Sequence, residues 1–175
     1  ADAVTVNPLF GWDGLAPFLA YAGAGKGAFA LVRTSNPGGR EVQDFGTEGA
    51  GRKFSDHLAE LVARWGEPYR GECGYSALGA VVGGTDPGEA ARLRRAMPAT
   101  FFLIPGYGAQ GGGAAEVAPC FAPDGGGAVV NAARSIIFAF RREDYRGRFG
   151  PGEYGAAARE AVLAARRDLA AVWRR

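Results

Sequence analysis

The segment TFFLIPGYGAQGG, residues 100–112, joins an apolar run to a loop that is rich in glycine. The apolar residues 101–104 are followed by Pro105, and the loop then carries Tyr107 and Gln110 among its glycines. Glycine contributes no side-chain contacts and loses much backbone entropy on folding, so a dense run of glycine needs a reason. A flexible linker and a loop whose N–H groups approach a ligand closely are the two explanations that this segment leaves open.

The same order of apolar run, turn and helical stretch recurs along the chain. The apolar runs lie at residues 3–6, 28–32, 78–82, 101–104 and 128–130. They do not alternate between polar and apolar residues, so we expect a parallel sheet that is buried on both faces.

Helical spacing of apolar residues lies between and after these runs. It covers residues 15–22, 54–65 and 154–174, and a weaker helix at 114–122 is shortened by Pro119. The stretch TDPGEAARLRRAMP, residues 85–98, predicts a helix with Asp86 as its N-cap, Pro87 at its first position and Glu89 placed for a capping box.

Five βα units and a last helix predict an α/β fold, with residues 1–175 as a single domain. An open doubly wound sheet and a (β/α)8 TIM barrel both fit this spacing. A barrel needs eight units in about 250 residues, so the chain would supply the last five units and a C-terminal helix. The chain starts at Ala1 inside a predicted strand and its only methionine is Met97, so we expect upstream strands that are absent here.

Composition restricts the function classes. The chain has 20 basic and 18 acidic residues and no block of basic residues, which argues against a nucleic-acid partner. We find neither an apolar run long enough for a membrane helix nor a signal peptide, so no membrane partner is expected. Cys73 and Cys120 lack the spacing of metal ligands, and two cysteines fit a reducing cytoplasm better than a disulfide scaffold.

Polar residues follow the predicted strands at the end where both architectures bind ligands. Barrels often bind phosphate with the loops after their last two strands, which here are the glycine-rich loop and the segment around Arg134. A guanidinium matches a phosphate dianion, and Gln110 offers a neutral donor. These two loops favour the barrel. Asn7, Thr34 and Asn131 lie at the same strand ends, but the sequence assigns them no role.

Four stretches of the chain together resemble one family. VTVNPLFG, FALVRTSNPGG, FFLIPGYGAQGG and NAARSIIFA are similar, in order and spacing, to orotidine 5′-phosphate decarboxylases of the bacterial type with a long loop after strand five. The resemblance runs from Ala1 to about Ala139 and corresponds to strands four to eight.

The resemblance implies a (β/α)8 barrel, usually a homodimer, that converts orotidine 5′-phosphate to UMP and CO2 in pyrimidine biosynthesis without cofactor or metal. It implies that Ser35 binds the pyrimidine, that Pro105 lies near the base and that Gln110 belongs to a loop that grips the phosphate. Arg134 would bind the phosphate together with the backbone N–H groups of Ala133 and Arg134 itself. Tyr107 lies in the gripping loop and is a further phosphate candidate.

The catalytic groups of that family have no match in this chain. They form a Lys–Asp–Lys–Asp network, three members of which belong to an Asp-x-Lys-x-x-Asp motif at the end of the third strand. Lys26 and Lys53 are the only lysines here, and Gly51 stands where the motif at Lys53 would need its first Asp. Lys53 and the sole histidine, His57, read as residues at or near a helix start. We therefore expect the catalytic residues upstream of Ala1.

Two alternatives to the decarboxylase remain open. The chain could be a phosphate-binding module that lacks catalysis, or part of another phosphate-binding barrel enzyme such as an isomerase. An Asp-x-Lys-x-x-Asp motif within about forty residues before Ala1 would decide for the decarboxylase, because one βα unit spans about thirty residues.

Overall fold

The computed structural model describes residues 1–46, 51–108 and 113–173. The strands are β1 (Ala3–Val6), β2 (Gly27–Arg33), β3 (Ser76–Val82), β4 (Thr100–Ile104) and β5 (Ala128–Val130). The helices are α1 (Gly11–Leu19), α2 (Gly39–Gln43), α3 (Phe54–Gly66), α4 (Pro87–Ala96), α5 (Ala114–Val117), α6 (Ala133–Ile137) and α7 (Tyr154–Trp173).

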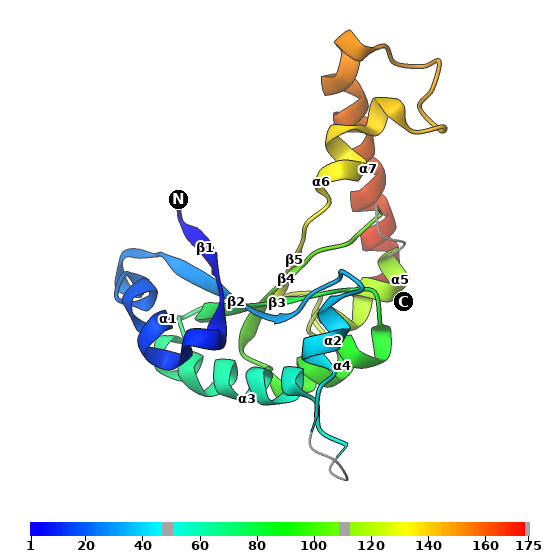
Figure 1. Ribbon diagram of the computed structural model, residues 1–175. Helices are drawn as coiled ribbons and strands as arrows, with labels where there is room; N and C mark the ends of the chain where they lie inside the picture. Colours follow the sequence, from blue (N-terminus) through cyan, green and yellow to red (C-terminus); the bar gives the residue numbers. More distant parts are fainter. Residues whose placement is uncertain (47–50, 109–112, 174–175) are drawn as a thin grey trace.

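The strands form one parallel sheet in the order β1-β2-β3-β4-β5, so each strand pairs with its neighbour in sequence. Helices α1, α3 and α4 lie along one side of this sheet (Figure 1). A doubly wound sheet reverses its strand order at a switch point and carries helices on both faces. The observed order is instead that of a barrel wall, which excludes the open-sheet alternative and confirms the α/β prediction.

The main core lies between the sheet and its helices. In β2 the side chains of Ala28, Ala30 and Val32 are buried, and in β4 those of Phe102 and Ile104. They pack against helix residues, of which the fully buried ones include Leu15, Leu19, Val62 and Leu93.

The opposite face of the sheet carries apolar side chains without helices over them. Phe29, Leu31, Phe101 and Leu103 are only half-buried, and Val129 is 46% exposed. The prediction that both faces are buried is therefore wrong for the described residues of β2, β4 and β5, whereas β3 is buried on both faces from Leu78 to Val82. Crossovers between consecutive strands all have the same hand, so in this strand order they place every helix on the same side.

Local signals placed α4 correctly. The Asp86 carboxylate accepts from the N–H of Glu89 at 3.0 Å, Pro87 opens the helix, and the helix ends before Pro98. The carboxylate of Glu89, however, pairs with Arg33 and Lys53, so only the Asp86 half of the predicted capping box is formed. The weak helix at 114–122 becomes α5 followed by a 3-10 turn at Ala118–Cys120 that contains Pro119.

Arg94 lies on the core side of α4 and is only 8% exposed. Its Nε donates to Cys120 O at 2.9 Å, Nη1 donates to Met97 O at 2.9 Å and Thr100 O at 2.8 Å, and Nη2 donates to Gly127 O at 2.9 Å. One side chain thus joins the end of α4, the start of β4, the turn after α5 and the entry to β5.

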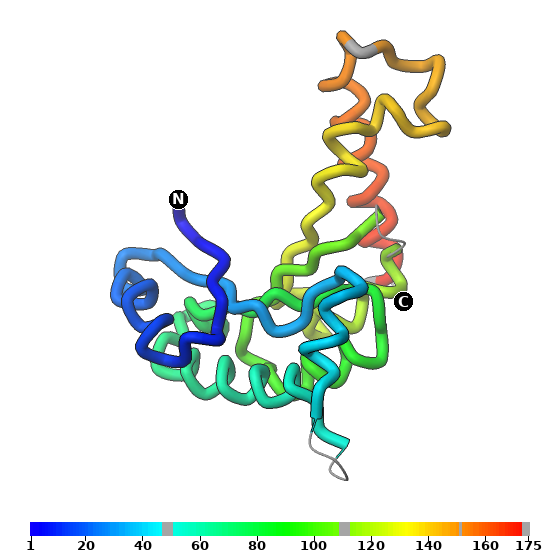
Figure 2. The backbone as a smooth tube through the Cα atoms, in the orientation of Figure 1, coloured from blue at the N-terminus to red at the C-terminus, as the bar shows by residue number. Residues whose placement is uncertain are grey.

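The C-terminal part forms an arm that projects away from the sheet (Figures 1 and 2). It consists of α6, two 3-10 turns at Ala139–Arg141 and Pro151–Glu153, and the long helix α7. The arm has a buried cluster of its own, made by Ala139, Tyr145, Ala157 and Ala161. Helix α7 matches the helix predicted at 154–174 to within one residue.

Candidate functional site

The loops after β4 and β5 lie side by side, because these two strands are adjacent and parallel as predicted. Phe102 pairs with Ala128 and Ile104 with Val130. Beyond the strands the two loops touch: a Cβ added to Gly108 would lie 3.0 Å from the Ser135 hydroxyl. Gly108 also has φ +77°, so both its conformation and its surroundings favour glycine.

A cavity of about 420 Å³ opens where these loops meet, and it is rich in arginine. Its lining is Gly108, Arg134, Ser135, Phe138, Arg141 and Arg142. Arg142 is already paired with Asp144, at 3.0 and 2.7 Å. Arg134 is exposed, and no carboxylate in the described part of the chain pairs with it. The cavity therefore offers a guanidinium that is available to an anion.

Ala133 and Arg134 are the first two residues of α6. The N–H groups in the first turn of a helix have no partner within the helix, so both are available to an acceptor. Gln110, the predicted amide donor, lies outside the described residues. The predicted meeting of Gln110 and Arg134 at one phosphate therefore remains a prediction.

Tyr107 is tied to the C-terminal helix. Its side chain is 9% exposed, and its hydroxyl donates to Asp168 Oδ2 of α7 at 2.7 Å. Burial, and then the hydrogen bond to Asp168, raise the pKa of Tyr107. The hydroxyl predicted as a phosphate candidate is thus engaged with α7 in this structure. Pro105, near the start of the same loop, is half-buried.

Ser35 lies just beyond β2, in contact with the chain that leaves β3. The N–H of Gly83 donates to Arg33 O at 2.8 Å, and a Cβ on Gly83 would lie 3.1 Å from the Ser35 backbone. Ser35 is half-buried there. Because the carboxyl ends of parallel strands share one edge, Ser35 lies on the same rim as the loops that carry Gly108 and Arg134.

Below this rim Arg33 enters the layer between sheet and helices, which the sequence did not indicate. A bulge between Leu31 and Arg33 sets Arg33 opposite Val82 and turns its side chain toward α4. Arg33 Nε lies 2.7 Å from Glu89 Oε2, and Nη1 lies 2.8 Å from Asp44 Oδ1 without hydrogen-bond alignment. Arg33 and Glu89 are nearly inaccessible to solvent, with 7% and 6% exposed side chains.

Lys53 joins the same cluster. Its Nζ donates to Asp44 Oδ1 at 3.0 Å and to Glu89 Oε1 at 3.2 Å, and Arg92 pairs with Glu89 and with Asp56. The hydrogen bond from Lys53 lowers the pKa of Asp44, and the same bond raises the pKa of Lys53. Three cations thus balance three carboxylates, and we name these six residues the ion cluster: Arg33, Asp44, Lys53, Asp56, Glu89 and Arg92.

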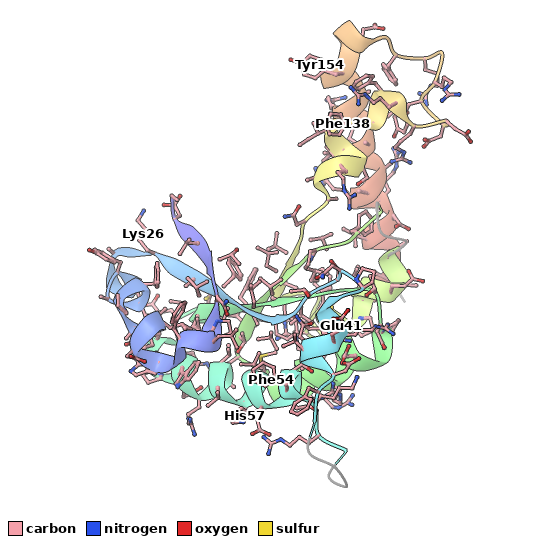
Figure 3. All side chains as sticks on the ribbon, viewed as in Figure 1. Lys26, Glu41, Phe54, His57, Phe138 and Tyr154 are labelled. Carbon is pink, nitrogen blue, oxygen red and sulfur yellow. The ribbon has the colours of Figure 1, made fainter. Side chains whose placement is uncertain are left out.

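Neither lysine lies at the carboxyl end of a strand, where its side chain could reach the rim. Lys53 is the N-cap of α3, in agreement with its reading as a helix start. Lys26, labelled in Figure 3, directly precedes β2 at the amino end of the sheet. Its Nζ donates to Asp2 Oδ1 at 2.6 Å. His57 is exposed on α3.

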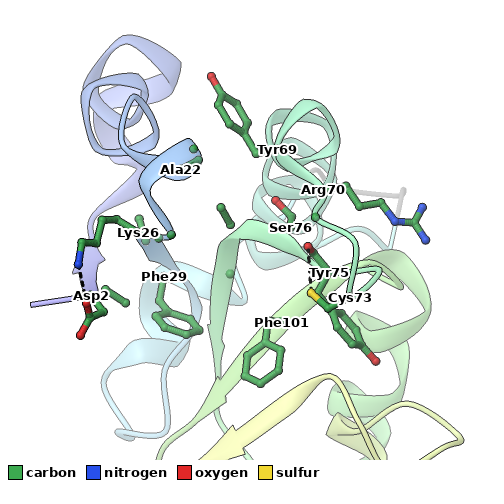
Figure 4. Close-up of a pocket in the computed structure, with 18 of the residues that line it drawn as sticks. Asp2, Ala22, Lys26, Phe29, Tyr69, Arg70, Cys73, Tyr75, Ser76 and Phe101 are labelled. Carbon is green, nitrogen blue, oxygen red and sulfur yellow. Dashed lines mark hydrogen bonds and ion pairs between the residues drawn. The ribbon is translucent and has the colours of Figure 1, made fainter.

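A cavity of about 600 Å³ lies at that amino end and is lined by Asp2, Lys26, Phe29, Tyr75 and Phe101, among others (Figure 4). It is remote from the rim that carries Ser35 and Arg134. Among the described residues no group of three or more His, Cys, Asp or Glu could hold a metal ion. Within the same ranges, no helix is long and apolar enough to cross a membrane.

Comparison with known proteins identifies the family. The model of the orotidine 5′-phosphate decarboxylase / HUMPS family matches residues 1–144. The orotidine 5′-phosphate decarboxylase of Clostridium novyi is 41% identical over 169 residues, which cover 96% of this chain and 57% of that protein. That of Petrotoga mobilis is 41% identical with the same coverage.

Solved structures agree. The OMP decarboxylase of Leishmania donovani is 30% identical, with a TM-score of 0.70 over 97% of this chain and 58% of that one. The chain thus spans less than two thirds of the length of these relatives, and its five strands form part of a TIM barrel. By the family match and these relatives, the chain belongs to the orotidine 5′-phosphate decarboxylase / HUMPS family.

Proposed function

We propose that these residues serve as the C-terminal part of an enzyme that decarboxylates orotidine 5′-phosphate to UMP and CO2, and that this part binds the substrate. One observation carries the proposal: the adjacent loops after β4 and β5 meet around Arg134, whose guanidinium has no acidic partner among the described residues. Ser35 on the same rim is then available to the pyrimidine, with Pro105 near the base.

The proposal assigns binding and chemistry to different parts of the barrel. Loss of CO2 leaves a carbanion-like centre, and an ammonium group placed beside it stabilises and protonates that centre. Such placed charge is usually the largest single contribution to catalysis. Lys26 is paired with Asp2 at the far end of the sheet and Lys53 is held in the ion cluster. The catalytic Lys and Asp residues would therefore come from further strands that complete the barrel.

The proposed enzyme is a lyase that needs no cofactor or metal, and it acts as a homodimer in the cytoplasm. Two free cysteines, Cys73 exposed and Cys120 buried, suit a reducing compartment. The competing proposal is a phosphate-binding module without catalysis, and the observation in its favour is that neither lysine is at the rim. A decarboxylation assay of the full-length gene product separates the two.

Replacement of Arg134 by alanine in the full-length protein tests the binding site. We expect UMP affinity to fall by about 1.5–3 kcal/mol, the contribution of a hydrogen bond to a charged group, or about 10- to 150-fold in Kd. Uridine, which lacks the phosphate, should bind equally well to both forms. Arg64→Ala, which removes an exposed arginine of α3, is the matched control. An equal loss for UMP and uridine would remove Arg134 from the phosphate site.

A further inference from the structure

The ten-residue segment from Thr34 to Gln43 is closed by a pair of hydrogen bonds between its ends. The backbone N–H of Thr34 donates to Gln43 Oε1 at 3.0 Å, and Gln43 Nε2 donates to Thr34 Oγ1 at 2.9 Å. One side-chain amide thus both accepts from and donates to the residue next to Ser35. We name this pair the Thr34–Gln43 clamp.

The space around the clamp is closely filled. A Cβ added to Gly39 would lie 2.5 Å from Thr34 Oγ1 and 3.2 Å from Gln43 Oε1. Gly83 lies close to the residue that follows Thr34, since a Cβ added to Gly83 would lie 3.1 Å from the backbone of Ser35. The contact at Gly39 is closer than a Cβ tolerates without movement of its neighbours, so a side chain there would push the clamp apart, whereas at Gly83 the Ser35 backbone would have to shift by only a few tenths of an ångström.

The ion cluster fixes the ends of the same segment. Arg33 directly precedes Thr34 and Asp44 directly follows Gln43, and Arg33 Nη1 lies 2.8 Å from Asp44 Oδ1. The ion pair and the clamp therefore form two successive cross-links at the base of one loop. Glu89 holds Arg33 from α4 and Lys53 holds Asp44 from α3, so the base is attached to two helices.

We propose that Gln43 is a positioning residue, whose amide fixes Thr34 and thereby sets the place of Ser35 at the rim. This inference rests on the proposed function, in which Ser35 contacts the pyrimidine. This positioning role requires an amide, because Thr34 offers its backbone N–H as a donor and its hydroxyl oxygen as an acceptor, and an amide can bind both. Leucine has a similar shape but makes neither hydrogen bond.

A double-mutant cycle in the full-length protein tests the inference, with Gln43→Leu, Ser35→Ala and the double variant. A net hydrogen bond changes an equilibrium by roughly 2- to 13-fold, so Gln43→Leu should lower kcat/KM for orotidine 5′-phosphate by about tenfold. In the Ser35→Ala background the same change should have little further effect. Glu41→Gln, a change on the exposed side of α2 (Figure 3), should leave kcat/KM unchanged.

Two further measurements keep the outcome clear. Hydrogen exchange of the Thr34 amide should accelerate in Gln43→Leu, both in the wild-type and in the Ser35→Ala background. Gly39→Ala crowds the clamp, so it should lower kcat/KM in the wild-type background and have little further effect in the Ser35→Ala background. Equal losses from Gln43→Leu with and without Ser35 would overturn the inference and leave the proposed function intact. No effect of Ser35→Ala on kcat/KM would remove the pyrimidine role of Ser35, and the inference with it.

Discussion

Replacement of Arg94 by leucine should strongly destabilise the fold, although Arg94 is not among the residues predicted to bind the substrate. The guanidinium makes four hydrogen bonds of 2.8–2.9 Å to backbone carbonyls and lies over the Phe102 ring, 3.5 Å from its centroid. Within the described ranges no carboxylate pairs with it. Burial lowers the pKa of Arg94 to about 10, so the group is still charged at neutral pH.

The size of the effect follows from two opposing contributions. Four hydrogen bonds from a charged donor, at about 1.5–3 kcal/mol each, give roughly 6–12 kcal/mol. Holding an ion out of water costs several kcal/mol, which leucine would no longer incur. Leucine would, however, remove one donor from each of the four carbonyls, although Met97 O and Gly127 O also accept from the N–H groups of Thr100 and Phe102. Since each buried acceptor that is left unsatisfied costs about 1–3 kcal/mol, we expect Arg94→Leu to lower the free energy of unfolding by about 3–5 kcal/mol.

The assay is urea denaturation of the full-length protein, followed by tryptophan fluorescence and circular dichroism. Arg95→Leu on the exposed side of α4 is the control, with an expected change within about 0.5 kcal/mol. Arg94→Lys should lie between the two, because an ammonium keeps the charge but lacks the planar fork. An Arg94→Leu protein within 1 kcal/mol of the wild type would refute the reasoning, since desolvation would then cancel the hydrogen bonds.

Three further predictions concern the activity of the isolated chain, the attachment of α7 and the ion cluster. The isolated 175-residue chain should not decarboxylate orotidine 5′-phosphate, and turnover that Lys53→Ala abolishes would show that Lys53 is catalytic after all. Tyr107→Phe and Asp168→Ala should each loosen α7, as seen by hydrogen exchange, and their effects should not add, because both remove one hydrogen bond; additive effects would contradict this. Because the pKa of Asp44 is lowered on folding, Asp44 contributes stability above its unfolded pKa of about 3.9, and this contribution is lost as the pH falls through its folded pKa. Because the pKa of Lys53 is raised on folding, Lys53 contributes stability below its unfolded pKa of about 10.4, and this contribution is lost as the pH rises through its folded pKa. The difference in Tm between wild type and Lys53→Met should therefore be flat from about pH 5 to 9 and shrink outside that range; a change near neutrality would assign it to other groups.

Much of the fold was predictable because its signals are local. The five apolar runs became strands, and Asp86 and Pro87 marked the start of α4. Spacing alone could not choose between an open sheet and a barrel, since both use the same βα unit. That choice depends on which strands pair, and pairing is a long-range property.

The sequence predicted which loops lie together at the candidate site, because these loops directly follow strands. The contacts beneath it were missed because they join distant elements: Arg33 reaches Glu89 of α4, and the hydroxyl of Tyr107 reaches Asp168 of α7. One signal was available for Arg94. It follows Leu93 and lies four positions after Ala90, within the apolar stripe of α4, where a solvated arginine would not be expected. The bulge that turns Arg33 inward left no signal in the sequence.

The strand order has a consequence for synthesis on the ribosome. Each strand pairs with the one that precedes it in the chain, so no strand has to be inserted between two that have already paired. A nascent chain can therefore extend the sheet at a single growing edge, one unit at a time, as domains fold from the N-terminus during translation. A doubly wound sheet must add strands at both edges. In this chain the order of the strands along the sequence is also their order across the sheet.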